Sequence, residues 1–159
     1  MNKPYRILVV CLGNICRSPM AEGLLRHKLA AAGLADRVVV DSAGTGAWHA
    51  GQPPDARATR VCAEHGIAID GLRARQVVAG DFDAFDLILC ADRNNLRHLR
   101  AIAPRDAHPR IALLLHKAGQ GAQAEVPDPY DGNLDDFRSV HRLLDGAIDA
   151  LLTTLQLPA

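Results

Sequence analysis

The sequence predicts an α/β fold: a single-domain three-layer sandwich in which a four-stranded parallel sheet carries helices on both faces. Four short runs rich in Val, Ile and Leu have the composition of strands buried on both sides, which is typical of parallel sheets. Segments with helical spacing of apolar residues alternate with these runs, as βαβ units require. The length of 159 residues is that of one ordinary domain, so we expect one domain over residues 1–159.

The first half of the chain contains two predicted strands, residues 7–10 and 38–40. Ser18 and Pro19 indicate the start of a helix between them, since Ser is favoured just before a helix and Pro in its first turn. That helix is expected to end near Gly33. After the second strand we expect a loop over residues 42–54. A helix over residues 55–65 should follow and be closed by Gly66.

The second half contains predicted strands over residues 86–90 and 111–115. A helix over 92–102 separates them and stops before Pro104. A loop over 116–134 is long for a compact domain, and long loops often carry function. The last helix is indicated by apolar residues at helical spacing: Phe137, Val140, Leu144, Ile148, Leu151 and Leu155.

Composition excludes several classes of function. The 18 basic and 18 acidic residues give zero net charge, which argues against a broad nucleic-acid-binding surface. No apolar run approaches the roughly 20 residues of a membrane span, and the run at 7–10 is too short for a signal peptide. We therefore expect a cytoplasmic monomer without membrane insertion. Its four cysteines should be free thiols, and neither a metal site nor a cofactor is expected.

The segment Cys11-Leu-Gly-Asn-Ile-Cys-Arg-Ser18 lies between the first strand and the first helix, where backbone N–H groups converge on anions. Gly13 permits close backbone approach or a positive φ, and Asn14 tolerates left-handed geometry. Arg17 can donate two parallel hydrogen bonds to a phosphoryl group. Cys11 in this setting is a candidate thiolate nucleophile. The simpler alternative is a buried Cys at a strand end and a solvated Arg.

Asp128 lies in Val126-Pro-Asp-Pro-Tyr-Asp-Gly132, within the long loop. Asp, Pro and Gly favour turns, and from this segment alone a turn is the simpler interpretation. Cleavage of a phosphate ester needs a proton for the leaving oxygen, and a positioned carboxylic acid can supply it. Asp128 is therefore a candidate general acid.

The string from Cys11 to Glu22 closely resembles the signature of the low-molecular-weight protein tyrosine phosphatases. The resemblance spans nearly the whole chain in the expected order. It implies the same four-stranded fold and hydrolysis of phosphotyrosine in proteins, with a bacterial tyrosine kinase among the partners. The further segments that carry it are Asp41 to Gly44, Trp48, Ala74 to Gln76, Asp86 to Asp92, and Asp128 to Tyr130.

The resemblance also implies a mechanism. Cys11 attacks phosphorus while Asp128 protonates the leaving oxygen, and water then attacks the phosphocysteine with Asp128 as base. Arg17 and the loop hold the phosphoryl oxygens throughout. The remaining residues that we expect to bind phosphate or substrate are Leu12, Gly13, Asn14, Ile15, Cys16, Ser18, Trp48 and Tyr130.

Supporting roles follow from the same comparison. Ser18 either caps the helix or hydrogen-bonds Cys11. Asn14 and Ser42 are expected to hold the loop, while Asp92 either caps the next helix or contacts Arg17. Three side chains would form the walls of a deep slot that favours aryl phosphates over phosphoserine: Leu12, Trp48 and Tyr130.

Two departures from the family are visible. Leu72 stands where the family often has a His that supports the loop, and Asp131 stands where some relatives have a second Tyr. Cys16 either fills space or captures oxidised Cys11 as a disulfide. Cys62 and Cys90 are expected in the core.

Three rival functions stay open. A thiol-dependent arsenate reductase on the same fold would need resolving cysteines near residues 80–90, where only Cys90 is found. Phosphoarginine phosphatases with a similar loop carry Thr at the position of Ile15. A phosphate-binding module without catalysis would leave Cys11 and Asp128 together unexplained.

Overall fold

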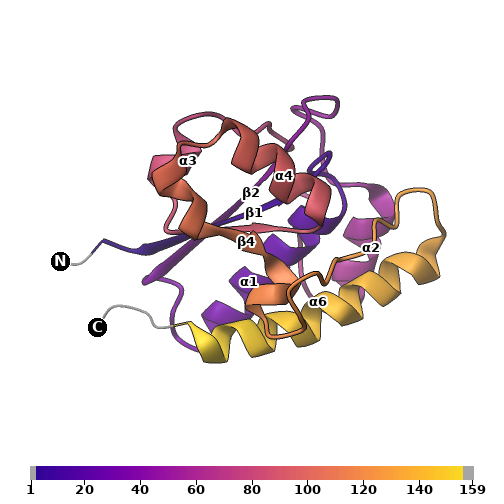
Figure 1. Ribbon diagram of the computed structural model, residues 1–159. Helices are drawn as coiled ribbons and strands as arrows, with labels where there is room; N and C mark the ends of the chain where they lie inside the picture. Colours follow the sequence, from indigo (N-terminus) through magenta and orange to yellow (C-terminus); the bar gives the residue numbers. More distant parts are fainter. Residues whose placement is uncertain (1–2, 156–159) are drawn as a thin grey trace.

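The chain folds around a four-stranded sheet whose strands are all parallel, in the order β2-β1-β3-β4 (Figure 1). This computed structural model describes residues 3–155, so residues 1–2 and 156–159 of the predicted domain lie outside the described part. The strands are β1 (Tyr5–Cys11), β2 (Val38–Gly44), β3 (Leu87–Cys90) and β4 (Ile111–Leu113).

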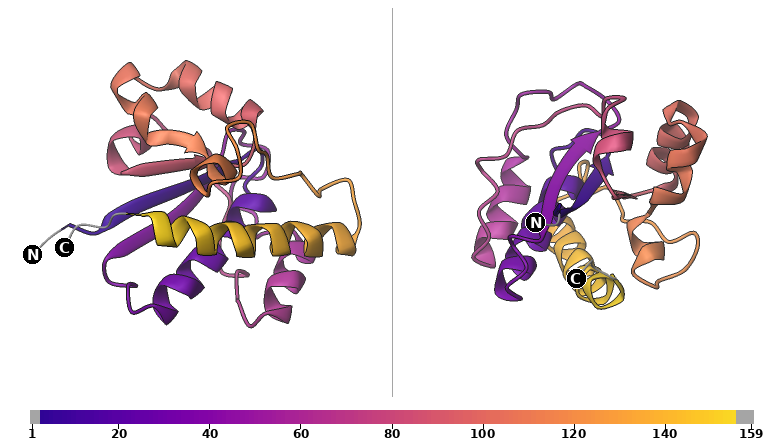
Figure 2. Two further views of the ribbon diagram at one scale, coloured as in Figure 1. Left: turned by 60° about the horizontal axis from the view of Figure 1, so that its bottom comes forward. Right: turned by 90° about the vertical axis from the view of Figure 1, so that its left-hand side faces the viewer.

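Helices cover both faces of the sheet, which confirms the predicted three-layer sandwich. The left view of Figure 2 shows α4 on one side, with α1, α2 and α6 on the other. Within residues 3–155, no helix is long and apolar enough to cross a membrane. The helices are α1 (Arg17–Ala31), α2 (Ala56–Glu64), α3 (Asp81–Ala84), α4 (Arg93–Ile102), the 3₁₀ helix η1 (Arg105–Arg110), α5 (Leu114–Lys117) and α6 (Leu134–Thr154).

The strand β1 is apolar without interruption from Ile7 to Val10 because both of its faces are covered. Ile7 and Val9 point into the core formed with α1 and α6, whereas Leu8 and Val10 point into the core on the α4 side. Successive side chains of a strand face opposite sides, so a strand covered on both faces is apolar at every position. Cys11 continues the first series and therefore lies on the α1 side.

The element boundaries differ from the predicted ones where pairing or a short helix decides them. β2 continues to Gly44 because its pairing with β1 continues to Cys11. β4 ends at Leu113, and the next four residues form α5 instead of the end of a strand. The short elements α3 and η1 are too brief to show a periodic apolar pattern and were not predicted.

The order of the strands creates a crevice at one end of the sheet. From β1 the chain passes through α1 to β2 on one side, and the next strand, β3, pairs with β1 on the other side. Ligands of open α/β sheets bind where the strand order reverses in this way, outside the carboxyl ends of the strands. Cys11 ends β1 and Asp92 follows β3 at this point.

Cys62 and Cys90 are fully buried, as the sequence predicts. Burial raises the pKa of the Cys62 thiol to about 12. The Cys90 thiol also has a raised pKa, chiefly from burial and then from the negative charge of Asp92. Both residues are inert packing groups at neutral pH.

His141 lies in the contact between α2 and α6. Its ring stacks on His65, with centroids 4.2 Å apart and planes 14° apart. Its Nε2 is buried and has no hydrogen-bond partner in the described part of the chain. Burial, then the nearby charges of His65 and Lys28, lower the pKa of His141, while the carboxylates Asp145 and Glu64 act in the opposite direction.

We predict that the fold loses stability on mild acidification and that His141→Phe weakens this loss. Because the pKa of His141 in the folded state lies below the ordinary 6.5, His141 binds a proton more readily in the unfolded chain. The contribution is complete above pH 6.5 and is lost as the pH falls toward the folded value. Phe keeps the stacking and cannot titrate. Urea midpoints at about pH 7.5 and about pH 5.5 test this; equal decreases for both proteins would contradict it.

Candidate active site

The nucleophile loop comprises residues 11–17, from the end of β1 to the start of α1. Cys11 is 3% exposed, and its Sγ lies 3.0 Å from the Ser18 hydroxyl. The carbonyls of Cys11, Leu12 and Ile15 accept hydrogen bonds from neighbouring segments. In contrast, the backbone N–H groups of residues 12–16 have no acceptor in the described part of the chain. A buried loop with such unpaired donors is suited to bind an anion.

Asn14 gives the loop its shape. Its φ of 57° makes it the one residue other than Gly with a positive φ in the described part of the chain. Asn pays a smaller penalty there than most residues. The side-chain Oδ1 accepts from the Arg75 N–H at 3.0 Å, and Nδ2 donates to Ser18 Oγ at 2.7 Å and Ser42 Oγ at 3.0 Å. Asn14 is therefore held on both polar atoms.

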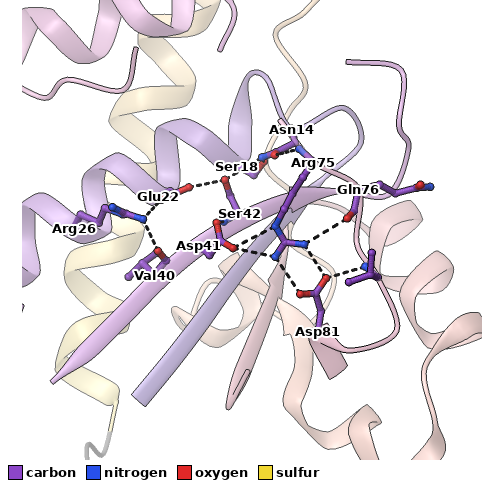
Figure 3. Close-up of polar contacts among 11 residues, drawn as sticks. Asn14, Ser18, Glu22, Arg26, Val40, Asp41, Ser42, Arg75, Gln76 and Asp81 are labelled. Atoms are coloured by element: carbon purple, nitrogen blue, oxygen red, sulfur yellow. Dashed lines mark hydrogen bonds and ion pairs between the residues drawn. The ribbon is translucent and has the colours of Figure 1, made fainter. Parts of the chain in front are cut away.

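A buried polar chain continues behind the loop, and Figure 3 shows its members. Ser42 Oγ donates to Glu22 Oε1 at 2.7 Å, and Glu22 Oε2 lies 2.6 Å from Arg26. Burial raises the pKa of Glu22, which the hydrogen bond from Ser42 and the charge of Arg26 oppose. The polar contacts thus extend from Cys11 through Ser18 and Asn14 to the buried carboxylate of Glu22, which pairs with the exposed Arg26.

Arg75 fixes the far side of the same network (Figure 3). Its guanidinium bridges Asp41 and Asp81, each at 3.0 Å. Its backbone N–H is the donor to Asn14. Leu72, which stands where the family often has a His, is half-buried and packs against the core. The described contacts of Asn14 need no side chain from position 72, so the loop keeps its support despite the substitution.

Arg17 is 3% exposed and contacts three acceptors. Nη1 donates to Asp92 Oδ2 at 2.8 Å and to the Val126 carbonyl at 3.0 Å, and Nη2 lies 3.5 Å from Asp128 Oδ2. Burial disfavours its charge, but Cys11, Asp92 and Asp128 outweigh burial, and the pKa of Arg17 is raised. The solvated Arg of the simpler sequence interpretation is therefore wrong.

The two alternatives for Ser18 and Asp92 are resolved by geometry. α1 begins at Arg17 and has no side-chain cap, so Ser18 does not cap it but contacts Cys11. Asp92 does both things expected of it. Its Oδ1 accepts from Asn95 N–H in a capping box at the start of α4, while Oδ2 holds Arg17.

Asp128 lies in the Asp128 loop, residues 126–132, and is 43% exposed. Its Oδ1 accepts from the Tyr130 N–H at 3.1 Å, so the segment does form the turn that its composition favours. The other carboxylate oxygen faces Arg17. Asp128 therefore lies in a turn and also faces the site.

These elements surround a cavity of about 160 Å³. The three expected wall residues Leu12, Trp48 and Tyr130 are exposed, and Trp48 lies against Gly46, where a Cβ would fall 1.7 Å from the indole. Trp48 is 70% exposed and does not belong to the core. The lining residues are Cys11, Leu12, Gly13, Ile15, Cys16, Arg17, Trp48, His49, Asp128 and Tyr130.

The cavity brings together most of the residues expected from the sequence. Asn14, Ser18, Ser42 and Asp92 do not line it; their side chains support the loop and Arg17 from behind. His49 was missed, because a single His beside Trp48 carries no periodic or motif signal. Its Nδ1 lies 2.9 Å from Gln52 Oε1, and its ring lies beside Gly13, where a Cβ would fall 3.0 Å from its Cδ2.

Cys16 is 4% exposed and has a raised pKa, from burial first and then from the negative charges of Asp55, Cys11 and Asp128. Cys11 and Cys16 are free thiols in this structure, so a disulfide between them stays a prediction. Among residues 3–155, no group of three or more His, Cys, Asp or Glu could hold a metal ion.

Comparison with known proteins gives one consistent family. The family described as low molecular weight phosphotyrosine protein phosphatase matches residues 6–158. A low molecular weight protein-tyrosine-phosphatase of Streptomyces coelicolor is 41% identical over 155 residues, which cover 96% of this chain and 94% of that protein.

Solved structures agree. The crystal structure of YfkJ from Bacillus subtilis has a TM-score of 0.89 and 40% identity, covering 96% of this chain and 95% of that one. Wzb from Vibrio vulnificus, solved in complex with benzylphosphonate, has a TM-score of 0.84 and 31% identity, covering 96% and 100%.

We predict that Asn14→Ala is less stable than Asn14→Gly, and that both are less stable than the natural protein. Both variants lose the hydrogen bonds of the side chain, about 1 kcal/mol each, but only Ala is strained at a positive φ, by about 1 kcal/mol more. Urea unfolding measures the order, and the rise in melting temperature with inorganic phosphate should shrink in both variants. An exposed control is Asn94→Ala. An Asn14→Ala variant as stable as the natural protein would contradict the account.

Proposed function

The chain belongs to the low molecular weight protein-tyrosine-phosphatase family and is an enzyme of that class. From that premise we propose that it hydrolyses phosphotyrosine in proteins, and small aryl phosphates, through a phosphocysteine intermediate on Cys11. Arg17 binds the phosphoryl group, and Asp128 is the general acid and base.

One observation carries the proposal: Cys11, Arg17 and Asp128 line the same small cavity. They come from the end of β1, the start of α1 and the Asp128 loop. A thiol at the mouth of unpaired N–H groups, a buried guanidinium and a partly exposed carboxyl are the three groups that transfer of a phosphoryl group to a thiolate requires.

In the first step the Cys11 thiolate attacks phosphorus in line with the leaving oxygen. The S–P bond forms as the P–O bond breaks, and Asp128 gives its proton to the leaving oxygen. The N–H groups of residues 12–16 and Arg17 hold the three equatorial oxygens, which carry the negative charge. Since the loop is rigid before substrate arrives, little reorganisation is needed at the moment of reaction.

In the second step water attacks the phosphocysteine. Asp128, now a carboxylate, accepts a proton from the water as the S–P bond breaks and inorganic phosphate forms. The Ser18 hydroxyl, 3.0 Å from Cys11 Sγ, can donate a hydrogen bond to the departing thiolate. Cys11 is thereby restored for another cycle.

The shape of the cavity supports an aryl substrate. Trp48 and Tyr130 stand exposed at its rim, where their rings can stack on the ring of phosphotyrosine. The shorter side chain of phosphoserine would leave its phosphate short of Cys11 in such a slot. The benzylphosphonate complex of the Vibrio relative agrees with this preference.

The rivals receive less support. Cys90 is fully buried with a raised pKa, which does not suit the resolving thiol of an arsenate reductase. Ile15 lines the cavity in the place where phosphoarginine phosphatases with a similar loop carry Thr. A module that only binds phosphate would have no use for Asp128 beside Arg17.

Other expectations also enter as proposals. We propose one catalytic domain, a monomer, and phosphotyrosine proteins as partners, among them a tyrosine kinase. We also propose a reducing compartment such as the cytoplasm, because oxidation of Cys11 would remove the nucleophile and all four cysteines are free thiols.

Turnover of four substrates tests the proposed function. We expect phosphotyrosine to be hydrolysed far faster than phosphoserine or phosphoarginine, with no reduction of arsenate, and Cys11→Ser to abolish the hydrolysis. Released phosphate and thiol-dependent arsenite formation are the measurements. Faster turnover of phosphoarginine, or hydrolysis retained by Cys11→Ser, would overturn the proposal.

Removing the acid should slow poor leaving groups most. Asp128→Asn is expected to lower kcat/KM for phenyl phosphate by about 10²-fold or more, and for p-nitrophenyl phosphate much less, because p-nitrophenolate leaves without a proton. Kinetics on both esters at one pH measure the ratio. The same loss for both esters would remove Asp128 from the role of acid.

A further inference from the structure

Arg57, in the first turn of α2, contacts the loop that carries Asp128. Its Nη1 donates to the Gly132 carbonyl at 2.9 Å, and its Nη2 donates to the Tyr130 carbonyl at 3.0 Å. The guanidinium also lies over the Tyr130 ring, 5.8 Å from its centroid. Figure 1 shows α2 beside the chain that leads into α6. Both carbonyls follow Asp128 within the same turn.

Arg57 is itself held in place from two sides. Asp55 accepts from its Nε at 3.0 Å and from its Nη2 at 2.9 Å, a bidentate pair. The guanidinium also lies over Phe137 of α6, 4.3 Å from the ring centroid. A long flexible side chain is thus ordered before it meets the Asp128 loop, and its bonds to the two carbonyls cost little further entropy.

Asp55 and Arg57, which together form a brace, also contact the nucleophile loop. The Asp55 backbone N–H donates to the Ile15 carbonyl at 2.8 Å, and the Asp55 side chain caps α2 through the Arg57 N–H. Asp55 and Arg57 therefore connect the loop that carries the nucleophile with the loop that carries the acid. Neither residue lines the cavity.

Arg17 also spans the two loops, through Nη1 to the Val126 carbonyl and through Nη2 to Asp128. Its Nη2 faces Asp128 at 3.5 Å, and a bound phosphoryl group competes with Asp128 for that donor. The bonds of Arg57 go to the backbone carbonyls of Tyr130 and Gly132, and Arg57 itself does not line the cavity. A phosphoryl group bound in the cavity therefore does not compete for these donors, so the contacts of Arg57 with the Asp128 loop keep their geometry during reaction.

We propose that Arg57 is a positioning residue for acid catalysis: with Asp55 it holds the Asp128 loop at the distance from Cys11 that lets Asp128 reach the leaving oxygen. The inference rests on the proposed function, because it requires Asp128 to be the general acid. An acid must lie within about 3 Å of the atom that it protonates, so a displacement of about 1 Å is costly.

Two variants of Arg57 test the proposal, and a third residue is the matched control. Arg57→Met keeps the apolar stem and loses every polar bond, while Arg57→Lys keeps the charge but has only three donors, on one nitrogen, for the four side-chain hydrogen bonds of Arg57. Arg138→Met is the control, since Arg138 on α6 pairs with Glu64 on α2 and is similarly exposed. It removes an ion pair between α2 and α6 without touching either loop.

We expect both Arg57 variants to lower kcat/KM for phenyl phosphate by about tenfold or more, and for p-nitrophenyl phosphate much less. Inhibition by inorganic phosphate should stay unchanged, since the nucleophile loop keeps its donors. Arg138→Met should leave the ratio of the two esters unchanged. If Arg57→Met fails to fold, Arg57→Lys still measures the ratio.

The background Asp128→Asn separates the possible failures. There the change in the ester ratio caused by Arg57→Lys should disappear, because no acid is left to misplace. If Asp128→Asn alone leaves the ester ratio unchanged, the proposed role of Asp128 fails. If it changes the ratio but the Arg57 variants slow both esters equally or neither, the brace is overturned and the function stands.

Discussion

A buried guanidinium must be paired, and the pairing of Arg17 organises this molecule. Arg17 is 3% exposed, so burial of its charge would be costly without the acceptors that surround it. Asp92 at the end of β3 and the Val126 carbonyl meet that need from elements far apart in sequence. The same positive charge lies beside Cys11 and Asp128. One electrostatic requirement thus draws the ends of two strands and the Asp128 loop around a single cavity.

The rest of the site keeps that cavity rigid. Asn14 turns the backbone so that the N–H groups of residues 12–16 remain without protein acceptors. Ser42 holds Asn14 from behind and is itself bonded to the buried carboxylate of Glu22. Backbone donors that are fixed before the substrate arrives stabilise developing charge most effectively. The Asp128 loop has a separate support in Arg57, so the proposed nucleophile and the proposed acid are held by different side chains.

The sequence predicted what depends on local pattern. Continuous apolar runs indicated the parallel strands, and the motif around Cys11 indicated the loop whose N–H groups have no protein acceptor. What it could not predict depends on distant contacts. Arg57 shows no local sign of a role, because its partners at Tyr130 and Gly132 meet it only in the fold. Ser18 carried a cap signal, but the helix begins one residue earlier and the hydroxyl turns to Cys11.

The central claim is that Cys11 becomes covalently phosphorylated and that no other side chain acts as a nucleophile. Rapid acid quenching during turnover of an aryl phosphate, followed by mass spectrometry of the peptides, tests it directly. The account predicts one phosphoryl group on the peptide that contains Cys11, in larger amount when Asp128→Asn slows hydrolysis of the intermediate. A phosphoryl group on another residue, or none while phosphate is released at the full rate, would contradict it.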